Sequence, residues 1–424
     1  MENGKRRHAR VGLAAVLTGV VALAVAAGGA TAKPQDNIVI RVASQAGGTQ
    51  PGFDAVAANF MKANPGVTIK NEYVPIATFS QTIDTQFQAG NAPDIVYGSA
   101  GSGNSNSLLP RARAGQLADL SKRVWAKRLP KELKPYAYLG NKLFMLPLNL
   151  VAVGAVYNAD LMKQNGWKPP TSYAQLLKLC SAAKAKGLAA WSIGGQFPNI
   201  SGAVLASSIV YAADPKWTSK RAAGKVTFAK SATWRKTLQR WVDMKNAGCF
   251  PEGVEGMGIP QALSLMASGR ALWYVAPAGV ENSIKAINSN FHAGFFTIPS
   301  GDSPAQTRAT VGWTDSLGVN AKSPNLQWAL KYIDFLAREG QSRLIPKAND
   351  AVSFTDFNKG IVPAILKPIT PQLKNAKRHT DLANTLWPNG DIYTALGQGM
   401  TGLLTGQKTI DQVLQDMDAA WNKG

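Results

Sequence analysis

The chain has 424 residues and a formal net charge of +21, with 46 lysine and arginine residues against 25 acidic ones. The basic residues are dispersed and lack the aromatic interleaving of a single-strand groove, so they indicate a solvated basic surface and no nucleic-acid partner. The length allows two ordinary domains. No repeat or low-complexity linker separates two halves, which favours lobes that interleave along the sequence.

The N-terminal segment has the three parts of a secretory signal peptide. A basic stretch at 5–10 precedes an apolar run at 11–27, and Ala30, Thr31 and Ala32 form a small-x-small cleavage site. We expect residues 1–32 to be a signal peptide, and the alternative is a retained membrane anchor. No cysteine lies at this junction, so we expect an exported protein, periplasmic or extracellular, without a lipid anchor.

The next part of the chain alternates strands and helices. The pattern predicts strands at 37–43, 67–74 and 95–97 and helices at 53–64 and 79–88. The loops at 44–50 and 98–107 follow strands. Ligands of open α/β sheets bind at the carboxyl ends of strands, so both loops are candidate ligand loops.

The stretch 142–167 organises the rest of the chain. An apolar run is interrupted at 146–149 (LPLN) and resumes at 151–157 (VAVGAVY), which indicates an extended connection leaving one compact unit and entering another. Tyr157, Asn158, Ala159, Asp160 and Leu161 then open a helix, which Asn158 or Asp160 can cap.

This stretch resembles the sugar-binding class of extracellular solute-binding proteins of ABC importers, family 1, which includes maltose-binding protein. The resemblance rests on the Pro-containing hinge strand, on YNADL at 157–161 and on PPTSY at 169–173, and it continues in order over roughly 38–421. It implies an α/β, two-lobed periplasmic-binding-protein fold of type II. Each lobe has a mixed sheet flanked by helices, with the ligand cleft at the hinge. The implied lobes are 36–148 with 311–358, and 149–310 with 359–424.

The expected second lobe contains the cysteines of the chain. Its pattern predicts helices at 171–186, 234–247 and 261–269 and strands from 191 and 270–275. Cys180 and Cys249 each end a helical pattern, and an even pair in an exported protein indicates a disulfide. The alternative is two buried thiols on unrelated helices.

A sugar site needs aromatic faces for the C–H surfaces of a pyranose and planar polar groups for its hydroxyls. The loops at the expected lobe junction supply both. The resemblance places Tyr393 at a sugar-stacking position and Phe197 near another, while Pro277 stands where maltose-binding protein has tryptophan, so we expect a ligand other than maltodextrin. The candidate ligand-binding residues are Gln45, Thr49, Tyr97, Asn104, Asn149, Gln196, Phe197, Trp313, Asp315, Trp387, Asp391 and Tyr393. Core packing is the alternative for each aromatic residue.

Signatures of catalysis are missing: the sequence has no H-E-x-x-H, C-x-x-C or G-x-S-x-G, and only His292 and His379 follow the leader. We expect no enzyme, cofactor or metal. The resemblance implies a monomer that captures a mono- or oligosaccharide by hinge closure and delivers it to the membrane permease subunits of an ABC transporter. Two alternatives stay open. One is an anionic solute such as a glycerol-phosphate ester or uronate, which would fit the basic charge, and the other is a secreted carbohydrate-active enzyme with paired carboxylates.

Overall fold

The computed structural model describes residues 38–301, 303–375 and 377–423. The predicted signal peptide lies outside these residues. Within the described residues, no helix is long and apolar enough to cross a membrane. They belong to one compact unit, which begins at Asn37.

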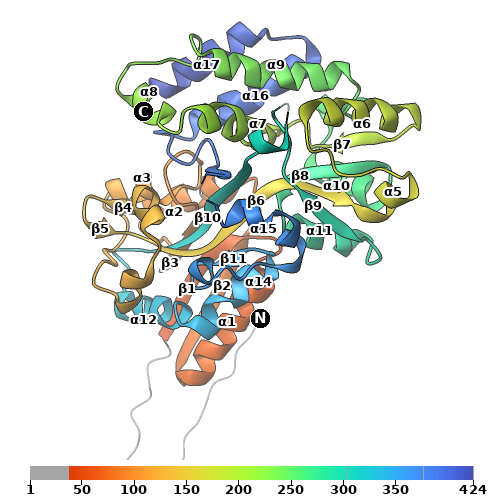
Figure 1. Cartoon of the computed structure of the whole chain (residues 1–424). Helices are drawn as coiled ribbons and strands as arrows, with labels where there is room; N and C mark the ends of the chain where they lie inside the picture. Colours follow the sequence, from red (N-terminus) through yellow and green to blue (C-terminus); the bar gives the residue numbers. More distant parts are fainter. Residues whose placement is uncertain (1–37, 302, 376, 424) are drawn as a thin grey trace, which may run out of the picture. The chain divides into compact units, whose positions relative to one another are not determined.

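A mixed sheet of ten strands runs through this unit (Figure 1). Seven strands lie side by side along its main path, and three short ones pair with the two central strands. The order along the path is β2 (Val67–Val74), β1 (Ile38–Gln45), β3 (Ile95–Gly98), β10 (Ala309–Val319), β6 (Leu146–Asn158), β8 (Ala271–Pro277) and β7 (Ala189–Ser192). The short strands are β9 (Ala293–Phe296) and β11 (Val352–Ser353), which pair with β6, and β12 (His379–Asp381), which pairs with β10. A separate hairpin joins β4 (Tyr138–Leu139) to β5 (Lys142–Leu143).

The two longest strands, β6 and β10, connect the halves of the sheet. The first part of β6 pairs with β10 and β11, and its second part pairs with β8 and β9. The far end of β10 pairs with β3. We call β6 and β10 the crossing strands. The interrupted apolar run at 146–157 is therefore one continuous strand, as Pro147 lies near its start and does not break it.

Helices cover both halves of the sheet, and Figure 1 shows α1, α12 and α14 beside β1 and β2, and α9, α16 and α17 at the opposite end. The first half carries α1 (Gln50–Ala63), α2 (Phe79–Gln88), α3 (Leu108–Arg113), α4 (Lys134–Ala137), α12 (Leu326–Leu336), α13 (Glu339–Ser342) and α14 (Leu344–Ala348). The other half carries α5 (Ala159–Gln164), α6 (Tyr173–Ala185), α7 (Asn199–Ala206), α8 (Trp217–Ala222), α9 (Ala232–Asn246), α10 (Ile259–Ala267), α11 (Val280–Ile287), α16 (Asp391–Thr405) and α17 (Ile410–Trp421). Short helical turns include η2 (Lys131–Leu133), η3 (Ser207–Tyr211), η6 (Phe357–Lys359), η7 (Ala364–Ile369) and α15 (Thr370–Leu373).

Local sequence explains where the helices begin. The Ser172 side chain accepts a hydrogen bond from the Gln175 amide and caps α6. Thr409 and Gln412 form a reciprocal capping box at the start of α17. Helix α1 buries Phe53, Val56 and Phe60, the face that the 3.6-residue period predicts.

The buried apolar residues form two clusters. The first contains residues of β1, β2, α1 and α12 and extends to β8, α10 and α11. The other cluster is rich in tryptophan and includes Trp191, Trp234, Trp241, Trp273 and Trp387. The disulfide expected between Cys180 and Cys249 is present in this second cluster, where both residues are fully buried. It joins α6 to the segment that follows α9.

Candidate ligand cleft at the crossing strands

A cavity of about 460 Å³ lies where the ends of several strands meet the crossing strands. Its walls come from the loop after β1, the loop after β3, the end of β8 with the start of α11, and the first turn of α16. Val153 of β6 and Thr314 and Asp315 of β10 form its floor. We call it the central cleft. Its place at the carboxyl ends of β1 and β3 is where α/β sheets bind ligands.

Seven of the twelve sequence-predicted residues line the central cleft. They are Gln45, Thr49, Tyr97, Asn104, Phe197, Asp315 and Tyr393. These residues come from positions up to about 350 apart in the sequence, so the fold brings them together. Phe197 is 59% exposed and Tyr393 is half-buried, so both rings have surface that a ligand can cover.

The floor of the cleft is a hydrogen-bonded group centred on Asp315. The Tyr97 hydroxyl donates to Oδ1 of Asp315 at 2.5 Å, and Nδ2 of Asn149 donates to Oδ2 at 2.7 Å. Nδ2 of Asn349 adds a longer bond of 3.4 Å to the same Oδ2. Burial, followed by the negative charge of Asp315, raises the pKa of Tyr97 well above its ordinary value. The Asp315 carboxylate is thus held by protein donors, and it joins β3, β6 and the segment after α14.

Asn149 belongs to this floor without lining the cavity. Its side chain is fully buried beneath Asp315. The structure therefore places it as a support for the cleft residues. Gln196 precedes Phe197 and donates to the carbonyl oxygen of Gly256 at 3.1 Å, outside the cleft lining.

Three further predicted residues lie elsewhere. Trp313 is 4% exposed and packs edge-on against Phe357, on the other face of β10. Trp387 is fully buried in the tryptophan-rich cluster, where its indole N–H donates to the Tyr211 hydroxyl at 2.9 Å. Asp391 is the exposed first residue of α16, and its backbone N–H donates to the Asn389 side chain. Both tryptophans are thus surrounded by core residues, which is the alternative that the sequence left open for each aromatic residue.

The loop after β3 reaches the cleft because two glycines allow a close approach to the segment 384–387. Gly101 has a φ of +83°, and a Cβ there would lie 2.1 Å from the carbonyl oxygen of Thr385. A Cβ on Gly103 would lie 1.7 Å from the carbonyl oxygen of Asn384. Asn384 also donates to the side chain of Asn104 at 2.7 Å. These contacts fix Asn104 at the cleft wall.

Sequence reasoning missed several lining residues. They are polar or aromatic and include Ser99, Asn106, Asn199, Tyr274, Ser283 and Asn349. Ser99 and Asn106 lie in the loop that the sequence marked as ligand-facing, so their position after β3 was a usable signal. Asn199 follows the strand predicted from 191 and lies two residues after Phe197, so its position was a usable signal as well. Asn349 follows no predicted strand, and only the folded chain brings it here.

The chain as a whole is strongly basic, but the lining of the central cleft is not. Its described lining contains amides, hydroxyls and aromatic rings, no lysine or arginine, and a single carboxylate, that of Asp315. Amides and hydroxyls can donate to and accept from a ligand rich in hydroxyl groups. The paired carboxylates of a glycosidase are not found among these lining residues.

Comparison with known proteins identifies the family. The family model of bacterial extracellular solute-binding proteins matches residues 46–342, and the chain belongs to this family. The resemblance seen in the sequence is thereby confirmed, and the family consists of binding proteins rather than enzymes.

Individual relatives are distant but align over most of the chain. The multiple sugar-binding protein of Streptococcus mutans is 21% identical over 413 residues, 92% of each chain. A binding protein of Brucella abortus is 25% identical over 324 residues, 76% of each chain.

Solved structures confirm the fold. The raffinose complex of RafE, a solute-binding protein of Streptococcus pneumoniae, has a TM-score of 0.75 at 20% identity, covering 91% of this chain and 99% of its own. A structure from work on xylan utilization by Caldanaerobius polysaccharolyticus has a TM-score of 0.77 at 18% identity, covering 90% and 99%. The neighbours are two-lobed solute-binding proteins, so the predicted α/β fold class is confirmed.

Proposed function

We propose that this protein captures a neutral carbohydrate in the central cleft by hinge closure and delivers it to the membrane subunits of an ABC transporter. The observation that carries the proposal is the cleft lining: amides, hydroxyls and the accessible rings of Phe197 and Tyr393 beside aliphatic side chains, with no lysine or arginine among its described residues. Aromatic faces cover the apolar side of a pyranose, and amides take its hydroxyls. Similar proteins include a multiple sugar-binding protein, a chitin oligosaccharide binding protein, and two whose solved structures are complexes with raffinose and with stachyose.

The anionic alternative fits the cleft less well. A uronate or phosphate ester needs cationic partners, yet the basic residues that give the chain its +21 charge lie elsewhere. The only lining carboxylate would repel such a ligand at short range. The charge of the chain therefore acts at its surface and not in the cleft.

The proposed movement uses the crossing strands. Residues 36–148 with 311–358 form one proposed lobe, and 149–310 with 359–424 form the other. Side chains from both proposed lobes line the cleft, for example Asn104 and Tyr393. A ligand that contacts both favours the closed arrangement by its differential affinity. The proposal includes export behind the signal peptide and action as a monomer.

A thermal-shift screen of the mature protein tests the proposal. The ligands are raffinose, stachyose, xylo-oligosaccharides and chito-oligosaccharides, with galacturonate and glycerol 3-phosphate as anionic counterparts. A ligand that binds only the folded state raises the melting temperature by mass action. We expect a shift with a neutral sugar and none with the anions. A shift with anions alone would support the alternative instead.

Delivery needs its own test. The mature protein, loaded with the sugar found in the screen, is added to vesicles that contain the candidate permease of the same cell. We expect sugar-dependent stimulation of ATP hydrolysis. If the loaded protein stimulates no permease, the proposed sugar ligand stands and the proposed role in transport is wrong.

A further inference from the structure

A second cavity, of about 310 Å³, lies on the face of the crossing strands opposite the central cleft. Side chains alternate between the faces of a strand. Accordingly, Leu150 of β6 lines the second cavity and Val153 lines the cleft, and Val311 and Trp313 of β10 line the second cavity while Thr314 lines the cleft. Asp315 also lines the cleft, because the pairing of β10 with β6 is irregular at this point. We call this second cavity the rear cavity.

Aromatic rings form much of its wall. Tyr136, Tyr211, Trp313 and Phe357 all line the rear cavity and come from four separate segments of the chain. Trp313 and Phe357 pack edge to face, with ring centroids 5.5 Å apart. The volume is at the lower end of the range of about 300–1,000 Å³ for small-molecule sites. Such a space suits one small molecule.

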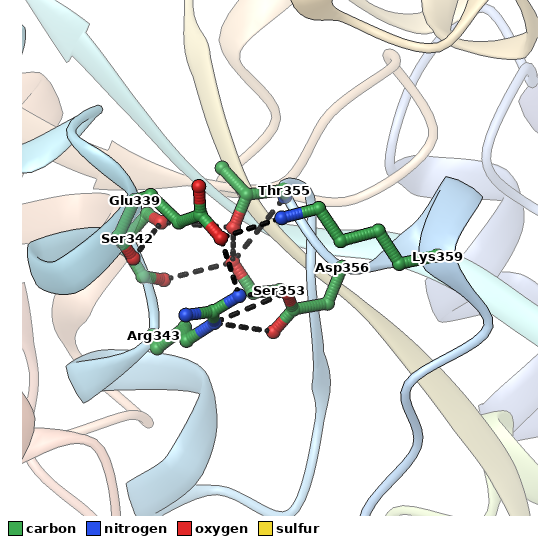
Figure 2. A network of polar contacts seen from close by, with 7 residues as sticks. All are labelled: Glu339, Ser342, Arg343, Ser353, Thr355, Asp356 and Lys359. Atoms are coloured by element: carbon green, nitrogen blue, oxygen red, sulfur yellow. Dashed lines mark hydrogen bonds and ion pairs between the residues drawn. The ribbon is translucent and has the colours of Figure 1, made fainter.

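An ionic network holds the turn that carries Phe357, as Figure 2 shows. Arg343 donates to both carboxylate oxygens of Asp356 at 2.7–3.1 Å and to Glu339 at 2.7 Å. Lys359 donates to the same oxygen of Glu339 at 2.5 Å. The network therefore anchors η6 at both ends, with Phe357 between Asp356 and Lys359. One wall of the rear cavity is thus built on a rigid support.

The rear cavity carries two acidic side chains and one histidine in its wall. Asp381 of β12 lines it, and Oδ2 accepts a hydrogen bond from the Tyr136 hydroxyl. Glu132 also lines it, as does His379, whose Nδ1 contacts the carbonyl oxygen of Gln372. No lysine or arginine is among the described lining residues, in a chain that has 46 of them. Within the described residues, Asp381 makes no ion pair with lysine or arginine.

We propose that the rear cavity binds a small organic amine that has an ammonium group on an apolar or aromatic body. Asp381 serves as the counter-ion of the ammonium group. The rings of Trp313, Phe357 and Tyr211 cover the body of the ligand and attract its charge. The two cavities share Leu382 in their walls, but the residues named here for the amine do not line the sugar cleft. The proposal does not rest on the proposed transport function.

The test compares two probes of nearly equal shape, 2-phenylethylamine and its neutral analogue 2-phenylethanol, in calorimetric titrations of the mature protein. We expect the amine to bind at least about tenfold more tightly than the alcohol. Asp381→Asn keeps an oxygen for the Tyr136 hydroxyl and removes the charge, so it should abolish this preference. Glu252→Gln, which removes a carboxylate outside the rear cavity, should leave the preference unchanged.

Two further measurements locate the site. Trp313→Leu should weaken the binding of both probes, because it removes an aromatic wall and not the charge. Tyr393→Ala, in the central cleft, should change neither affinity. The proposal is overturned if the amine shows no saturable binding at millimolar concentration, if both probes bind equally, or if Asp381→Asn retains the preference.

Discussion

The two cavities beside the crossing strands each have an aspartate in their wall, Asp315 of β10 and Asp381 of β12, and the two aspartates differ in their partners. Asp315 on the cleft side is 4% exposed and accepts hydrogen bonds from Tyr97, Asn149 and Asn349. Asp381 on the rear side is open to the cavity and accepts from Tyr136 alone among side chains. A carboxylate with several side-chain donors supports structure, whereas a carboxylate with one can receive a ligand. The number of partners, more than the residue type, separates the two roles.

The largest expected effect distinguishes the two aspartates by stability. Asp315→Ala leaves the buried donors of Tyr97 and Asn149 without an acceptor, so we expect the free energy of unfolding to fall by roughly 2–5 kcal/mol. Asp381→Ala should cost less than about 1 kcal/mol, because water can replace its role in the cavity. Urea unfolding of both variants, followed by circular dichroism, measures the difference. Equal losses would mean that partner number does not separate the two groups.

The second effect concerns ligand affinity and the two aromatic residues that the sequence favoured. Tyr393 lines the central cleft and Trp313 lines the rear cavity. Tyr393→Ala should weaken binding of the cognate sugar by about tenfold, since a lost aromatic contact is worth roughly 1 kcal/mol or more. Trp313→Leu should change sugar affinity much less. Titration calorimetry with the sugar found in the thermal-shift screen measures the affinity of both variants. A larger loss of affinity for Trp313→Leu than for Tyr393→Ala would mean that Trp313 contributes to the sugar site.

Much of the fold could be predicted from the sequence because its periodicities are local. The strand at 67–74 and the helix at 79–88 have the predicted bounds in the structure. Strand β12, at three residues, is too short for any period to reveal, and it pairs with β10 from a distant part of the chain.

Trp313 shows where local reasoning about the site fails. Residues 313 and 315 should share a face of a regular strand, and both were predicted to bind the ligand. The pairing of β10 with β6 is irregular between Gly312 and Asp315. This irregularity sends Trp313 to the rear cavity and Asp315 to the cleft. Partner strands set the irregularity, so the sequence of β10 alone does not reveal it.

A smaller effect should follow from the support of the rear wall. Arg343→Ala removes the side chain that joins Asp356 to Glu339, so the turn carrying Phe357 loses its anchor. We expect the affinity for 2-phenylethylamine to fall a few-fold, while sugar binding in the central cleft stays unchanged. Arg235→Ala is the matched control, because it removes an exposed arginine that pairs with Asp411 far from this wall. Parallel titrations of the two variants measure the effect, and identical amine affinities would contradict the supporting role of the network.

The smallest expected effect is a pH dependence of the free energy of unfolding that arises from Asp381 in the rear cavity. Burial raises the pKa of Asp381 above its ordinary value of 3.8, although the Tyr136 hydrogen bond and nearby His379 oppose the shift. The other ionisable groups that line the rear cavity are Glu132, His379, Tyr136 and Tyr211. Because the folded state holds the proton to higher pH than the unfolded state, Asp381 stabilises the fold below pH 3.8, and this contribution is lost as the pH rises through the folded-state pKa.

Asp381→Asn removes this titration while keeping the shape of the side chain. The variant should therefore gain stability relative to the parent as the pH rises from below 3.8, until the difference reaches a plateau. Other acidic groups titrate in both proteins, so only the difference between the two unfolding free energies is informative. Urea titrations at a series of pH values from acid to neutral provide it. A difference that stays constant or shrinks with pH would contradict the raised pKa of Asp381.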